Sequence, residues 1–166
     1  LTVLDTGLVS FGKPAKITAV VSAGSSGVVN VEREVQMSGK IHSKAIMTIT
    51  AYIQNVFAQE KAINFNASIA FEQNYGGIDG DSASIAEVYV LLSSLSKQPI
   101  KQSIAVTGSI NQFGDVQPVG GVNEKITGFF EICKINGLDG SHGVILPFQN
   151  VKDLMLNKEI VEAVKE

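Results

Sequence analysis

Apolar residues recur at intervals of three and four in three segments, which predicts three amphipathic helices. The first is predicted over 42–58, the second over 82–96, and the third from Gly120 to a stop at Gly137. Their apolar stripes are Ile46, Ile49, Ile53, Val56 and Phe57; Ile85, Val88, Tyr89, Leu92 and Leu95; and Val122, Ile126, Phe129, Phe130 and Cys133.

Strands are predicted around these helices. The segments 17–21 and 28–31 are rich in β-branched residues and flank the turn 24–27, which predicts a hairpin. Alternation over 63–69 is typical of a strand with one buried face. Further strands are predicted at 103–108, 115–117 and 144–146, then a helix from a cap at Asn150 through Met155 and a helical piece at 159–165. The pattern predicts a single mixed α+β domain over residues 1–166.

The composition is that of a packed globular protein, with 45% hydrophobic and 17% charged residues and a mean hydropathy of +0.21. The net charge is −3 and Arg33 is the one arginine, which argues against a nucleic-acid partner. Apolar runs such as 104–106 fall far short of the roughly 20 residues of a membrane span. With Cys133 as the one cysteine and no signal peptide at the start, we expect a cytoplasmic protein without a membrane partner.

Metal and nucleotide chemistry have little support in the sequence. His42 and His142 are isolated from each other and from ligand-spaced acidic clusters, so we expect structural or solvated roles for both and no metal site. The phosphate-binding pattern of nucleoside triphosphatases does not occur in the chain. We therefore expect no cofactor in this domain.

Ser82 is a candidate nucleophile at the start of the second predicted helix. The segment 77–84 joins a strand to this helix through two glycines, and helix N-terminal N–H groups there can hold an oxyanion. The alternative is that Ser82 only caps the helix, or that Ser84 does so in a capping box with Glu87. The segment by itself leaves both interpretations open.

Lys125 is the candidate base, since a serine without a histidine partner needs a neutral amine. It lies at the border of the third apolar stripe, between Val122 and Ile126. Lowering a lysine pKa from about 10.4 to about 7 or 8 costs on the order of 4 kcal/mol, which burial and neighbouring charges can supply. The alternative is a lysine that extends from the edge of the core into water.

Two motifs together resemble the proteolytic domain of Lon proteases. The first is GDSAS at 80–84 followed by TGS at 107–109, and the second is GDVQPVGGVNEK at 114–125. Asp81 stands where the bacterial housekeeping branch tends to have proline. In this position the sequence is similar to the LonB-like branch. The segments 10–14, 31–35, 39–44 and 71–77 also resemble that branch, so the resemblance covers essentially the whole chain.

The resemblance implies a serine endopeptidase with a Ser-Lys dyad, in which Ser82 is the nucleophile and Lys125 the general base. It implies that Thr107 hydrogen-bonds near the lysine amine, and that Asp79 can pair with that amine and hold an inactive state. The implied fold is the Lon proteolytic domain type, ribosomal protein S5 domain 2-like. No metal or organic cofactor takes part.

Full-length members of the family carry an upstream ATPase module that uses ATP, and they form hexameric rings that degrade unfolded or damaged polypeptides. The implied partners are such polypeptides and further copies of the chain, and the implied state is a fragment trimmed at both ends. Two alternatives are a catalytically silent Lon-like domain that serves as a ring-forming scaffold and a small-molecule-binding module of the same superfamily. Because silent relatives usually lack the serine or the lysine, the presence of Ser82 and Lys125 favours the peptidase.

Overall fold

The computed structural model describes residues 1–164, in which helices and strands are mixed along the chain. The elements are β1 (Thr2–Asp5), β2 (Ser10–Lys13), β3 (Ile17–Ala23), β4 (Gly27–Asn30), α1 (Val31–Glu34), α2 (Lys40–Phe57), β5 (Phe65–Phe71), α3 (Ser84–Ser96), β6 (Ile104–Val106), β7 (Ser109–Ile110), β8 (Val116–Gln117), α4 (Val122–Asn136), β9 (Gly143–Ile145), the 3-10 helix η1 (Phe148–Asp153) and α5 (Lys158–Ala163). The three long predicted helices are confirmed as α2, α3 and α4. The chain forms a small mixed α and β domain, as predicted, while Lys165 of the last predicted helix lies outside the described residues.

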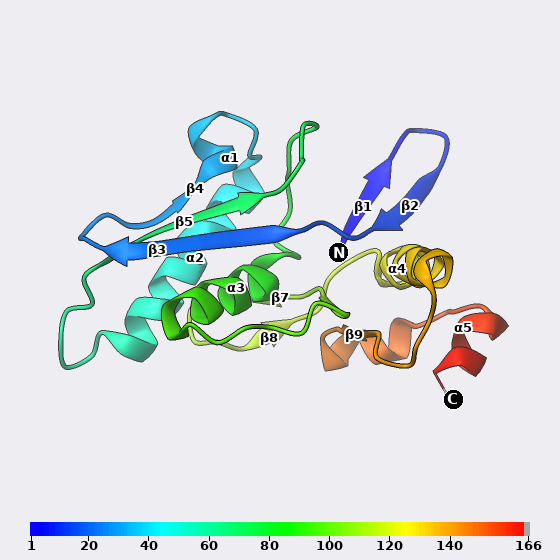
Figure 1. The fold of residues 1–166 in the computed structure, drawn as a ribbon. Helices are drawn as coiled ribbons and strands as arrows, with labels where there is room; N and C mark the ends of the chain where they lie inside the picture. Colours follow the sequence, from blue (N-terminus) through cyan, green and yellow to red (C-terminus); the bar gives the residue numbers. More distant parts are fainter. Residues whose placement is uncertain (165–166) are drawn as a thin grey trace.

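The central sheet has the strand order β3-β5-β4, so the predicted hairpin of β3 with β4 is wrong. β5 lies between them, antiparallel to β3 and parallel to β4 (Figure 1). Its alternation is confirmed, because Ala67, Ile69 and Phe71 are buried. The side chain of Asn66 on β5 accepts a hydrogen bond from the N–H of Ser26 at 2.8 Å, so the turn between β3 and β4 is bound to β5.

Helices α2 and α3 supply much of the core. The buried cluster unites Ile49 of α2, Ile69 of β5 and Leu91 of α3, each with no exposed surface. The predicted stripe of α2 is confirmed at its first three positions, but Val56 and Phe57 in the last turn are 46% and 49% exposed. The periodicity thus predicted the helix correctly and overestimated how far its apolar face is covered.

Helix α4 packs closely on the β1–β2 hairpin through two glycines (Figure 1). A Cβ atom at Gly128 would lie 1.8 Å from the carbonyl oxygen of Gly12, and one at Gly12 would lie 2.0 Å from that of Glu124. No side chain fits at either position without a backbone shift. The two glycines therefore bring the first turns of α4, which carry Lys125, against the hairpin.

The C-terminal third departs from the prediction at Asn150. This residue does not cap a helix, because it lies inside η1, whose N-cap is Pro147. Its buried side chain accepts from the N–H of Val119 at 2.9 Å and donates to the carbonyl of Val119 at 3.0 Å. The Asn150 side chain thus pairs with both backbone groups of Val119, as a neighbouring strand would, in the turn that leads into α4. The short strands are confirmed as β6 paired parallel with β9, and as β8 paired antiparallel with β7.

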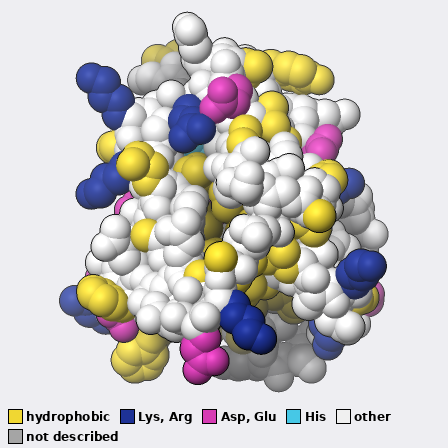
Figure 2. All heavy atoms as spheres, turned by 90° about the vertical axis from the view of Figure 1, so that its left-hand side faces the viewer, with side chains coloured by type: hydrophobic (Ala, Val, Ile, Leu, Met, Phe, Trp, Pro, Cys, Tyr) yellow, Lys and Arg dark blue, Asp and Glu magenta, His cyan; other side chains and the backbone are white. Residues whose placement is uncertain are grey.

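The end of the sheet that is on the left in Figure 1 presents hydrophobic side chains in a furrow, with basic side chains (Lys or Arg) scattered around its margin (Figure 2). A hollow at this end is lined by Val28, Ile53 and Phe65 among others. Within residues 1–164, no helix has both the length and the apolar character to cross a membrane.

Candidate active site

The loop between β5 and α3 presents Ser82 just before the helix begins. The N-cap of α3 is Ala83, and no side chain caps it. The capping alternatives are therefore wrong for both serines: the hydroxyl of Ser84 donates to the carbonyl of Asp81 at 2.5 Å, and Glu87 is buried against His42 instead of closing a capping box. The hydroxyl of Ser82 is not used to start the helix.

Hydrogen bonds fix the backbone on both sides of Ser82. Its carbonyl accepts from the N–H of Gly108 at 2.8 Å and from the hydroxyl of Thr107 at 3.2 Å. The carbonyl of Asp81 accepts from the N–H of Ser84 at 3.0 Å, in addition to the hydroxyl of that residue. Thr107, which is 1% exposed, thus contacts the backbone of Ser82.

Lys125 lies in the first turn of α4 and is 3% exposed, between Val122 and Ile126, which are also buried. Its Nζ donates to the carbonyl of Gly120 at 2.9 Å. Burial lowers the pKa of this amine below the ordinary lysine value, while the negative charges of Asp81 and Glu124 act in the opposite direction. A buried amine with one backbone acceptor and a lowered pKa has the properties of a base that can work in its neutral form.

Ser82 and Lys125 line the same cleft, which has a volume of about 1080 Å³. One wall is formed by β1 and the segment 13–16, and another by the segment 71–80 that leads from β5 toward α3. The fold therefore brings two residues that are 43 positions apart in the sequence to one cavity. The arrangement can place a hydroxyl, a buried amine and an extended ligand together.

Asp79 also lines the cleft, but its carboxylate is engaged at the start of α2. It accepts from the N–H groups of Gly80 at 2.8 Å and of Ile41 and His42 at 3.1 Å each. These bonds, the one from Gly80 foremost, lower the pKa of Asp79. Gly39 leaves room for this cap, since a Cβ there would lie 2.1 Å from the Asp79 carboxyl carbon.

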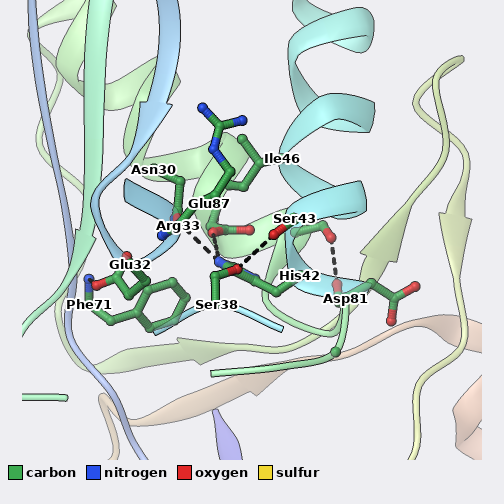
Figure 3. Close-up of polar contacts among 12 residues, drawn as sticks. Asn30, Glu32, Arg33, Ser38, His42, Ser43, Ile46, Phe71, Asp81 and Glu87 are labelled. Carbon is green, nitrogen blue, oxygen red and sulfur yellow. Dashed lines mark hydrogen bonds and ion pairs between the residues drawn. The ribbon is translucent and has the colours of Figure 1, made fainter. Parts of the chain in front are cut away.

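Buried polar side chains form a cluster in the interior (Figure 3), and the sequence analysis did not single out two of them, Asn30 and Glu32. His42, fully buried, lies 3.5 Å from Glu87 and 3.3 Å from the amide of Asn30, which gives it the structural role expected. Glu32, also buried, accepts from the N–H of Phe71 at 2.7 Å. The sequence signal that could have predicted the burial of Glu87 is its spacing, because Glu87 lies one helical turn before Leu91, which is buried. Among residues 1–164, no group of three or more His, Cys, Asp or Glu side chains is placed to hold a metal ion.

Comparison with known proteins shows which family this chain resembles. The model of the Lon protease (S16) C-terminal proteolytic domain matches residues 57–166. The chain is similar to a protein named "Putative Lon protease homolog" of Escherichia coli (strain K12), with 48% identity over 157 residues, which are 95% of this chain and 27% of that protein.

Two further relatives extend this likeness. A protein of the same name from Haemophilus influenzae is 47% identical over 157 residues, covering 95% of this chain and 26% of the relative. An Archaeal Lon protease of Methanothermobacter thermautotrophicus is 35% identical over 127 residues, covering 76% of this chain and 18% of the relative. The chain spans about a quarter or less of the length of these curated relatives.

Proposed function

Because the chain belongs to the Lon protease C-terminal proteolytic domain family, we propose that it cleaves peptide bonds as a LonB-like serine endopeptidase with Ser82 as nucleophile and Lys125 as general base. The observation that carries the proposal is the burial of Lys125, with its lowered pKa, in the cleft that Ser82 also lines. A lysine extending into water would be more exposed and would keep its ordinary charge.

In the proposed reaction the neutral amine of Lys125 takes the proton of the Ser82 hydroxyl while Oγ attacks the carbonyl carbon of a peptide bond. The resulting oxyanion is held by backbone N–H groups at the start of α3. Within the described residues, the N–H groups of Ser82 and Ala83 donate to no protein acceptor, which suits this role. Lys125 then gives its proton to the leaving amine, and water releases the acyl group from Ser82.

Supporting roles follow from the contacts. Thr107 holds the carbonyl of Ser82, so it keeps the nucleophile's backbone in place. Asp79 is bound to the start of α2, and in the proposed active state it leaves the lysine amine unpaired. The reaction as proposed uses no metal or organic cofactor in this domain.

For the whole protein we propose what the family resemblance implies. An upstream module uses ATP, the subunits form a hexameric ring, and the substrates are unfolded or damaged polypeptides. The proposed topology is ribosomal protein S5 domain 2-like. The proposed compartment is the cytoplasm, where a reducing environment preserves the buried free thiol of Cys133.

The test is cleavage of casein and of fluorogenic peptides by the protein and by Ser82→Ala, Lys125→Ala and Lys125→Arg. All three variants should lose turnover, since arginine stays protonated and cannot accept the serine proton. A serine-reactive fluorophosphonate should label Ser82, as read by peptide mass spectrometry, in the parent protein but not in the Lys125 variants. Circular dichroism and thermal melting should show that each variant is folded.

Matched controls lie on the same two helices. Ser96→Ala removes an exposed hydroxyl from α3, and Lys134→Arg keeps the charge that pairs with Glu159 on the surface of α4. Both should retain turnover and labelling. Turnover by Lys125→Arg would show that the lysine is not the base. A parent protein that is folded yet inert to peptides and to the label would favour the silent scaffold.

A further inference from the structure

The carboxylate of Asp81, the residue before the proposed nucleophile, is bound by a buried serine. Oδ2 of Asp81 accepts from the hydroxyl of Ser109 at 2.9 Å. Ser109 lies in β7 and is 4% exposed, whereas Asp81 is exposed. A buried hydroxyl needs a partner, and the Asp81 carboxylate supplies it.

This bond joins β7 to the loop that carries Ser82. In Figure 3 the Asp81 side chain points away from the buried pair of Glu87 and His42. The carbonyl of Asp81 is fixed separately by Ser84, so the backbone stays in place whatever the carboxylate does. The orientation of the carboxylate therefore depends on Ser109.

The same carboxylate acts on Lys125. The charge of Asp81 raises the pKa of the lysine amine against the larger effect of burial. Glu124 acts in the same direction as Asp81. Yet in the described part of the chain Asp81 and Lys125 form no ion pair. The carboxylate is close enough to influence the amine and is held without pairing with it.

We propose that Ser109 is a positioning residue, which holds the Asp81 carboxylate on β7 and so keeps it from pairing with the amine of Lys125. The inference rests on the proposed function, in which that amine is the general base. Without the Ser109 hydroxyl, the carboxylate loses its donor, turns to the amine and stabilises the charged form. A charged amine cannot take the proton of Ser82, so cleavage at neutral pH falls.

The experiment measures the protonation of the amine directly and beside catalysis. Protein labelled with 13C at its lysines is titrated by NMR, and the chemical shift of Cε of Lys125 is followed. This signal is assigned by its absence from Lys125→Arg. Peptide cleavage is measured over the same pH range. The variants are Ser109→Ala, Asp81→Asn, the double variant, and Ser109→Thr, which keeps the hydroxyl. Asp81→Asn is nearly isosteric and still offers Ser109 an acceptor, so it removes the charge with little change in packing.

The expected result is a set of shifts with opposite signs. Ser109→Ala should raise the lysine pKa and move the acidic limb of the rate profile to higher pH, while Asp81→Asn should lower both. The double variant should match Asp81→Asn, because Ser109 acts only through the carboxylate, and Ser109→Thr should restore the parent values. A merely structural role for Ser109 would reduce stability or rate without moving the titration.

The outcomes separate this inference from the proposed function. A lysine pKa unchanged in Ser109→Ala or in Asp81→Asn overturns the inference, even where the parent protein cleaves peptides. If Ser109→Ala does not fold, Ser109→Cys takes its place, since a thiol is a much weaker donor than a hydroxyl and the lysine pKa should again rise. Shifts as expected in a protein that cleaves nothing would support the inference about the lysine and overturn the peptidase proposal.

Discussion

Replacing Glu87 by glutamine should change how the stability of the protein depends on pH. Glu87 of α3 and His42 of α2 are both fully buried, with Oε1 and Nε2 3.5 Å apart (Figure 3). Neither carboxylate oxygen has a hydrogen-bond partner within the described residues. Burial, and next the charge of Glu32, raise the pKa of Glu87 to about 8, while burial lowers the pKa of His42. At neutral pH the pair is therefore a neutral acid beside a neutral imidazole, not an ion pair.

The magnitude follows from proton linkage. Above the ordinary histidine value of 6.5, His42 is neutral in the folded protein and increasingly neutral in the unfolded protein, whereas up to about pH 8 Glu87 is protonated only in the folded protein. The unfolded state then binds fewer protons, so this group's contribution to stability decreases as the pH rises. The loss is about 1.4 kcal/mol per pH unit, which amounts to about 2 kcal/mol between pH 6.5 and pH 8.

Glu87→Gln removes this dependence because an amide does not titrate. The free energy of unfolding of the variant minus that of the parent should therefore increase by about 2 kcal/mol from pH 6.5 to pH 8. The measurement is urea denaturation of both proteins at several pH values. Taking the difference cancels groups such as Lys125, which contribute equally to both. Glu131→Gln, at an exposed position of α4, is the control and should give a flat difference.

A flat or decreasing difference for Glu87→Gln would refute the reasoning. It would mean that Glu87 is ionised in the folded protein, stabilised by a charged His42 or by water. A flat difference that is not zero would show, in addition, that the substitution changes the packing around position 87.

Two further substitutions test the packing that supports the site. Gly128→Ala should destabilise the protein by about 1–3 kcal/mol although alanine favours a helix, because its Cβ would meet the carbonyl of Gly12. Thermal melting measures the effect. The control is Gly76→Ala, because a Cβ at Gly76 would have no atom within 4 Å. Unchanged stability of Gly128→Ala would contradict the close contact. Asn150→Ala should cost about 1–3 kcal/mol in urea denaturation, because it leaves both buried backbone groups of Val119 unpaired. A neutral effect would show that water replaces the amide.

The sequence alone determined the parts of this protein that depend on one element at a time. The spacing of Ile46, Ile49 and Ile53 predicted α2, and the alternation ending at Ile69 predicted β5, because periodic burial is written in the order of apolar residues along a segment. The motifs around Ser82 and Lys125 predicted the family through their resemblance to Lon proteolytic domains, and the family is confirmed.

Only the tertiary structure decided which elements meet. Similar strand patterns at β3 and β4 are compatible with a hairpin, and only the fold shows that β5 separates them. Asn150 read as a cap because its amide suits that role, whereas in the folded chain it pairs with a backbone 31 residues away. A pattern along the chain records how much of a face is buried and not which partner buries it. The shared cleft of Ser82 and Lys125, and the hold of Ser109 on Asp81, therefore emerge only when distant segments pack together.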